Sequence, residues 1–244
     1  MDLLEQEEWL RAVAELYQND PKEAIEYLNE EIRLDPEWPA PYVSLVLCYL
    51  KERQYARALA EATLLMYLCP AYFKGYFAAG LICRCKGEYE NAEPHFDSAI
   101  LLCRDWSAAA GIYRSRGLNS WQAEDRLRAL DDFCMAIMLE PERSDCWLYR
   151  GWVHLQLGAF QQALYDLNMA IELGCEDVDA WVGRCVAFNN LGREAEASAD
   201  LKKAWAMGYV DEENRSLRER SLAGFYYYRA RALVGLRAIW RRRG

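Results

Sequence analysis

The chain has 244 residues, 53% of them hydrophobic and 13% aromatic, so it has enough apolar material for a large core and is not expected to be disordered. Its formal net charge of −9 argues against nucleic acid as a partner, because phosphate binding requires a basic surface. The longest apolar runs, SLVLCYL and YFAAGLIC, are too short to cross a bilayer, and the acidic start MDLLEQEEWL lacks the features of a signal peptide. We therefore expect a soluble, cytoplasmic protein without a transmembrane segment.

The chain repeats itself with a period of 34 residues. Six alanines follow one another at intervals of 34, apart from a single interval of 37: Ala24, Ala58, Ala92, Ala129, Ala163 and Ala197. An aromatic row has the same defect: Tyr42, Tyr76, Tyr113, Trp147 and Trp181. Independent rows share one three-residue insertion, so the period is not a coincidence, and the insertion is expected in the connection around CRDWSAA.

In chain order, the predicted copies span six ranges: 5–38, 39–72, 73–106, 110–143, 144–177 and 178–211. Within each copy apolar residues recur at three- and four-residue steps, which predicts two helices joined by a short turn. Small residues such as Gly80, Gly117 and Gly151 form a row that lets the two helices approach closely. The first copy is less regular, with Glu8 at the aromatic position, as expected of a terminal repeat that faces solvent.

The two ends of the chain carry opposite charges. Residues 1–36 hold eleven acidic and three basic residues, a net of −8, whereas residues 215–244 hold nine arginines and one glutamate, a net of +8. Apolar spacing within 216–243 predicts a basic helix that caps the last repeat. The row that carries this pattern is Leu222, Phe225, Tyr226, Arg229, Leu233, Leu236 and Trp240.

A 34-residue helix–turn–helix with these aromatic, glycine and alanine rows, and with Pro36, Pro70 and Pro141 at the ends of copies, resembles the tetratricopeptide repeat. The resemblance covers about residues 5–211. It implies an all-α, right-handed α-solenoid of six helical hairpins over 1–214, followed by the capping helix at 215–244. It also implies that the first helices of the hairpins line a concave groove that takes peptides or partner helices.

Three arginines and three aspartates occur together in the second half of the chain. Each arginine lies in a first helix and each aspartate in the paired second helix: Arg116 with Asp132, Arg150 with Asp166, and Arg184 with Asp200. We predict an ion pair within each of these repeats that fixes the helix register. The alternative is a polar track for a ligand.

The residues expected in the groove are apolar. They form two neighbouring rows: Val43, Phe77, Leu148 and Val182, with Arg114 as the one charged member, and Leu47, Leu81, Leu118, Trp152 and Val186. The lysines, asparagines and arginines with which some proteins of the resembled family grip an acidic C-terminus are missing from nearly every position, so binding of that kind is not expected. An apolar groove fits an apolar peptide or helix, with Trp152 as the expected anchor. The alternative is that these side chains pack between first helices or against a folded-back C-terminal helix.

No catalytic site, metal site or cofactor is expected. The nine cysteines form no CxxC pair, and with only His95 and His154 no zinc site can be assembled, so the cysteines are interpreted as buried residues in a reducing compartment. Phosphate-binding loops and the GxSxG and HExxH motifs are missing.

The sequence thus predicts a non-catalytic interaction scaffold, adaptor or chaperone that binds a protein partner in its groove. The basic tail, with Arg237, Arg241, Arg242 and Arg243, fits a solvated helix end. Alternatively, the protein is a structural module that uses this tail to associate with the acidic first repeat of another copy or to contact a membrane surface.

Overall fold

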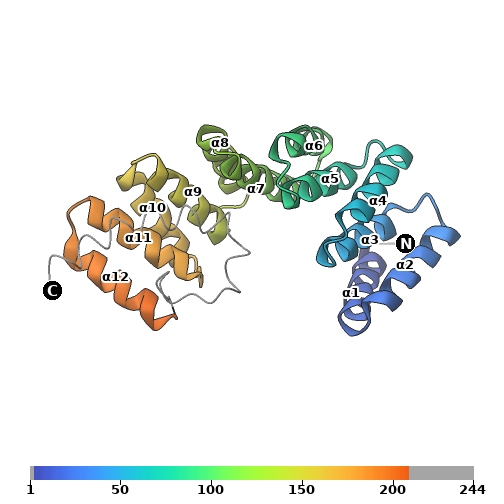
Figure 1. Cartoon of the computed structure of the whole chain (residues 1–244), viewed down its shortest axis with the longest axis horizontal. Coiled ribbons are helices and arrows are strands. Elements are labelled where there is room, and N and C mark those ends of the chain that lie inside the picture. The colour runs from blue at the N-terminus through green and yellow to red at the C-terminus, as the bar shows by residue number, and fades with distance from the viewer. Residues whose placement is uncertain (1–2, 209–244) are drawn as a thin grey trace. The chain divides into compact units, whose positions relative to one another are not determined.

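The computed structural model describes residues 3–208, and over this range the chain forms twelve α-helices arranged as consecutive hairpins (Figure 1). The helices are α1 Leu3–Asn19, α2 Pro21–Leu34, α3 Pro39–Lys51, α4 Tyr55–Leu68, α5 Phe73–Cys85, α6 Tyr89–Leu102, α7 Trp106–Gln122, α8 Arg126–Leu139, α9 Ser144–Gln156, α10 Phe160–Glu172, α11 Val178–Asn190 and α12 Glu194–Ala206. The predicted all-α solenoid of hairpins is confirmed. The predicted capping helix at 215–244 and its basic residues lie outside the described residues.

The chain divides into two compact units, with the boundary inside α7 between Ser115 and Arg116. In the first unit the successive first helices α1, α3 and α5 contact one another, and each packs on its second helix. In the second unit α9 and α11 are neighbours in the same way, and α10 lies against both. Each unit therefore has its own series of first helices, and the two series are treated separately below.

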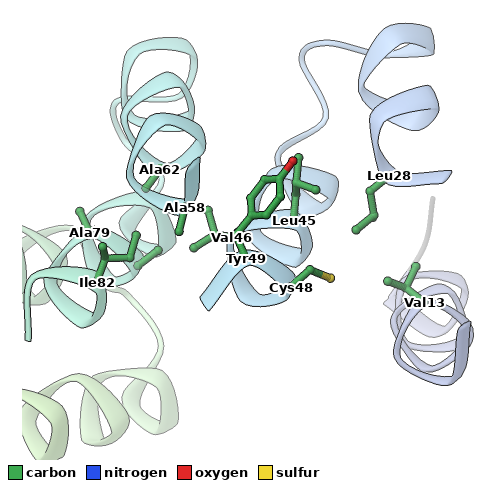
Figure 2. Close-up of a cluster of buried hydrophobic side chains, with 11 residues drawn as sticks. Val13, Leu28, Leu45, Val46, Cys48, Tyr49, Ala58, Ala62, Ala79 and Ile82 are labelled. Atoms are coloured by element: carbon green, nitrogen blue, oxygen red, sulfur yellow. The ribbon is translucent and has the colours of Figure 1, made fainter. Parts of the chain in front are cut away.

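The core of the first unit is built where each first helix meets the second helices on either side of it (Figure 2). Val13, Leu28 and Leu45 come from three successive helices and are almost or completely buried. Ala58 on α4 and Ala79 on α5 are fully buried on the other side of this cluster. Alanine recurs here because two helix backbones approach closely only where one side chain is short.

The row of glycines is explained in the same way, by helices that cross at close distance. A methyl group on Gly80 of α5 would lie 2.8 Å from the Phe96 ring of α6, and one on Gly151 of α9 would lie 2.9 Å from Leu167 of α10. Contacts this short are not tolerated between carbon atoms, so the closest approach of the two helices requires glycine. The register predicted from the small residues is thus the packing register of the hairpins.

The turns inside hairpins two to six share one backbone conformation. Gly87, Gly158 and Gly192 have positive φ angles of 78°, 73° and 73°, and the residues at the same register in repeats 2 and 4 are Arg53 (φ 57°) and Glu124 (φ 65°). A side chain in this left-handed region costs about 1 kcal/mol compared with glycine. The fold therefore imposes the turn even where the sequence provides no glycine.

The three-residue insertion lies in a helix. The prediction that residues 107–109 belong to a connection is wrong, because α7 begins at Trp106 and has 17 residues, compared with 13 in α5 and α9. The connection before α7 is short, and Asp105 Oδ1 accepts a hydrogen bond from the Ser107 backbone N–H at the helix start (3.1 Å). The insertion adds about one turn to the first helix.

Candidate functional site

The apolar row of the first unit is accessible to solvent. We call Val43 and Leu47 on α3 together with Phe77 and Leu81 on α5 the first inner face. Leu47 is 49% exposed, and the other three side chains are half-buried. Phe77 and Leu81 pack against the buried cluster around Phe96. The first inner face is therefore fixed by the core on one side and accessible to solvent on the other.

The corresponding row of the second unit is closed to solvent. We call Leu148 and Trp152 on α9 together with Val182 and Val186 on α11 the second inner face. None of the four side chains is more than 6% exposed, whereas Leu118 on α7 is half-buried. A methyl group on Gly183 would lie 3.3 Å from the Trp152 indole, which shows that this ring fills the space between α9 and α11. Trp152 is therefore part of the interior, and it is not exposed in the way expected of an anchor for a partner.

The three arginine–aspartate pairs have the same geometry. In each pair Nε and Nη2 of the arginine donate to the two carboxylate oxygens, at 3.0 and 2.6 Å for Arg116–Asp132, 2.9 and 2.7 Å for Arg150–Asp166, and 2.8 and 2.8 Å for Arg184–Asp200. The aspartates are buried and the arginines nearly so. Two parallel charge-assisted bonds fix the relative position of two helices more strictly than apolar contact does.

Two of these arginines also reach the preceding repeat. Arg150 Nη1 donates to Cys134 Sγ (3.3 Å), and Arg184 Nη1 donates to Asn168 Oδ1 (2.8 Å). Burial alone would lower the pKa of Arg150, but the hydrogen bond and charge of Asp166 outweigh burial and raise it. Each arginine therefore links its own second helix to the preceding one, which is a structural role.

The first unit has no such pairs among its described residues at this register. Leu45 and Ala79 occupy the arginine positions and are fully buried. The residues at the aspartate positions are Glu61, whose pKa is raised by burial, and His95, whose pKa is lowered by burial. At these positions the first unit has buried apolar side chains where the second unit has ion pairs.

His154 lies beside the second arginine–aspartate pair. Its Nε2 lies 3.6 Å from Asp166 Oδ2, a carboxylate already held by Arg150. Burial, and secondarily the Arg150 charge, lower the pKa of His154 against the opposing effect of Asp166. Residues 3–208 contain no cluster of histidine, cysteine and acidic side chains suited to a metal ion, and none of their helices is long and apolar enough to span a membrane.

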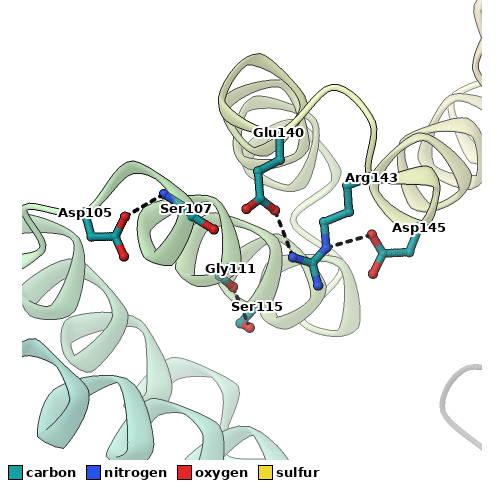
Figure 3. A network of polar contacts seen from close by, with 7 residues as sticks. All are labelled: Asp105, Ser107, Gly111, Ser115, Glu140, Arg143 and Asp145. Carbon is teal, nitrogen blue, oxygen red and sulfur yellow. Dashed lines mark hydrogen bonds and ion pairs between the residues drawn. The ribbon is translucent and has the colours of Figure 1, made fainter. Parts of the chain in front are cut away.

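Polar contacts outside the 34-residue rows were not found from the sequence. Arg143, in the connection between α8 and α9, donates to Glu140 at 2.8 Å and to Asp145 at 3.2 Å (Figure 3). Trp121 Nε1 donates to Gln156 Oε1 at 2.9 Å. The signal visible in the sequence for the Arg143 contacts was the presence of acidic residues on both sides of this arginine.

Serial helical hairpins on one 34-residue register, with buried alanine and glycine rows at the crossings, define a helical-repeat solenoid protein. The family model of the tetratricopeptide repeat matches residues 9–71, and the same hairpin continues through α12. The described helices therefore have the fold of tetratricopeptide repeat proteins, and residues 9–71 match the family model itself.

Solved structures share this fold at low sequence identity. A tetratricopeptide repeat protein described as having an unusual peptide-binding site, YrrB, is 20% identical, with a TM-score of 0.62 over 75% of this chain and 93% of its own. PilF of Pseudomonas aeruginosa is 13% identical, with a TM-score of 0.71 over 81% and 89%. A tetratricopeptide repeat protein of Parabacteroides merdae is 17% identical, with a TM-score of 0.66 over 94% and 86%. No curated protein matches the sequence significantly.

Proposed function

We propose that the protein is a non-catalytic interaction scaffold that binds an apolar peptide or helix of a partner protein on its first inner face. The observation that carries this proposal is the exposure of Leu47 next to Val43, Phe77 and Leu81, on two first helices that contact each other. A soluble protein gains by covering contiguous apolar surface, and an amphipathic helix covers a row of this kind with its own apolar stripe.

The comparisons support a protein partner. The family consists of helical repeats, and one structural neighbour is described as peptide-binding. All nine cysteines of this chain are unpaired, which supports placing it in a reducing compartment such as the cytoplasm. The identity of the partner would decide whether the protein acts as an adaptor or as a chaperone.

The test uses a peptide display library selected against the wild-type chain, followed by affinity measurements on the selected peptides. The Leu47→Lys, Leu81→Lys double variant puts two charges into the first inner face. Its matched control is Leu64→Lys, Leu101→Lys, which changes two exposed leucines on the second helices of the same unit (43% and 81% exposed).

We expect the inner-face variant to bind at least about tenfold more weakly, because each leucine that loses its apolar contact forfeits roughly 1–2 kcal/mol. The control variant should bind like the wild type. Equal loss in both variants, or in neither, would refute binding at the first inner face.

The alternative function acts through residues 215–244, outside the described residues. Association driven by this basic segment should weaken as ionic strength rises, whereas binding to an apolar face should not. The salt dependence of any measured association therefore separates the two functions.

A further inference from the structure

One edge of the first unit carries a row of exposed apolar side chains. We call this row the connection edge, because it lies where each second helix ends and the chain turns into the next first helix. Its members are Leu34, Tyr67, Leu68, Leu101 and Trp106. Tyr67 is 82% exposed, Leu101 81% and Trp106 76%. The first inner face is formed by α3 and α5 alone, so the connection edge is a separate surface.

The backbone fixes the positions of these side chains. In the connections after α2 and α4, the N–H groups of Trp38 and Tyr72 donate to the carbonyl oxygen three residues before them, at 3.2 and 2.9 Å. Tyr67 and Leu101 are 34 residues apart and occupy the same place in the last turn of α4 and α6. Because each repeat stacks on the one before it, the row has a regular spacing.

The aromatic register of this edge is covered in one repeat and open in another. Trp38 and Trp106 lie at the same register, two repeats apart. Trp9 packs on Trp38, with 4.6 Å between the ring centroids, whereas Trp106 is exposed next to the exposed Leu101. Large apolar side chains that gather on one exposed surface mark a site of association.

The size of the connection edge matches one side of a stable interface. Side chains of this size bury roughly 150–250 Å² each, so the exposed fractions leave about 600 Å² of apolar surface. A complex of standard size buries about 800 Å² on each partner, roughly 60% of it apolar. The connection edge supplies that apolar share without any other surface.

Two properties favour a second copy of this chain as the partner. A row with one regular spacing interdigitates with an antiparallel row of the same spacing, and a second copy necessarily has that spacing. The charges also match: Asp35 and Glu37 are exposed at one end of the row, and Arg104 is exposed at the other. The neighbouring Asp105 is engaged at the start of α7. A two-fold axis near Tyr67 places the arginine of one chain opposite the acids of the other.

We propose that the protein forms an antiparallel, two-fold symmetric dimer through the connection edge of its first unit. The first inner face stays free in this dimer, so the inference does not depend on the proposed function. Each dimer then presents two first inner faces to its partners.

The test measures sedimentation velocity of the full-length chain and of two double variants over a range of concentrations. Tyr67→Lys with Leu101→Lys puts charges into the connection edge, at helix C-termini where lysine is well accommodated. The matched control is Leu47→Lys with Leu81→Lys, in the first inner face. We expect the wild type and the control to dimerise. The edge variant should dimerise at least about a hundredfold more weakly, because four apolar side chains per dimer lose their contacts.

Charge reversal tests the antiparallel arrangement. Arg104→Glu should weaken the dimer severalfold, and Glu37→Arg in the same chain should restore it, because the two positions face each other across the two-fold axis. The wild-type dimer should also persist at high ionic strength, since its contact is mainly apolar. A second substitution that fails to restore the dimer would overturn the antiparallel arrangement.

Two further measurements keep this proposal separate from the proposed function. Circular dichroism should show the same helicity in all variants, and the edge variant should bind the selected peptides like the wild type. A wild-type chain that stays monomeric at every concentration would overturn the dimer. An edge variant that dimerises like the wild type, or an equal loss in the edge and inner-face variants, would overturn it as well.

Discussion

The two units have the same repeat and maintain it by different means. In the first unit the positions between the helices of a hairpin hold Leu45 and Ala79, and apolar contact sets the register. In the second unit the same positions hold arginines bonded to buried aspartates. The comparison teaches that the alanine and glycine rows are sufficient to specify the hairpin, whereas the ion pairs add links between successive repeats.

Removal of one buried charge should produce the largest difference in stability change between the two units. Asp166→Ala leaves the Arg150 guanidinium without its carboxylate, and we expect a loss of about 3–5 kcal/mol in the free energy of unfolding. Glu61→Ala, at the same register in the first unit, should be neutral or slightly stabilising, because burial raises the pKa of that carboxyl. Urea denaturation followed by circular dichroism measures both. Equal losses would show that the two units do not differ in this respect.

A smaller effect should be common to both units. Gly80→Ala and Gly151→Ala place a methyl group against Phe96 and Leu167, and each should cost about 1–3 kcal/mol. Gly111→Ala is the control, since a methyl group there meets no atom within 4 Å and should stabilise α7 by about 0.5–1 kcal/mol. Thermal unfolding of the three variants gives the comparison. A neutral Gly151→Ala would mean that the ion pairs, more than the close approach, position the helices of the second unit.

Substitutions at the turn inside the hairpin should change the stability of the two units in opposite directions. Arg53→Gly relieves a left-handed side chain in the first unit and should stabilise it by up to about 1 kcal/mol, whereas Gly158→Ala at the same register should destabilise the second unit by a similar amount. Urea midpoints determined at a common pH resolve the two signs. The same sign in both would argue that contacts of the Arg53 side chain outweigh its backbone cost.

The smallest effect is a pH dependence shared by the two histidines. Burial lowers the pKa of His95 in the first unit and of His154 in the second, so the unfolded chain binds protons more readily than the folded chain. Stability should therefore be complete at neutral pH and be lost as the pH falls through about 6.5 toward the lowered pKa values. In the His95→Gln and His154→Gln variants the loss of stability below pH 7 should be smaller. Hydrogen–deuterium exchange at pH 7 and pH 5.5 locates the effect in one unit or the other.

Much of the architecture was predictable because alanine and glycine recur in the sequence at the positions where two helices cross closely. The bonds of Arg150 and Arg184 to their own aspartates also lie where the shared 34-residue spacing placed them. The extra turn of α7 was not predictable, since three additional residues fit a loop as well as a helix. The burial of Trp152 depends on the close approach of α9 and α11 at Gly183, which is tertiary information that the period does not contain.

The reach of Arg150 and Arg184 to the repeat before them has a mechanical consequence. Because each guanidinium contacts residues 16 positions before and after it, separating one hairpin from the next breaks charge-assisted bonds together with apolar contacts. In a chain stretched between optical traps, hairpins coupled in this way should come apart in a single large extension, whereas hairpins held by apolar packing alone should peel off one at a time. We therefore expect the repeats linked by Arg150 and Arg184 to be stiffer than those that carry the first inner face.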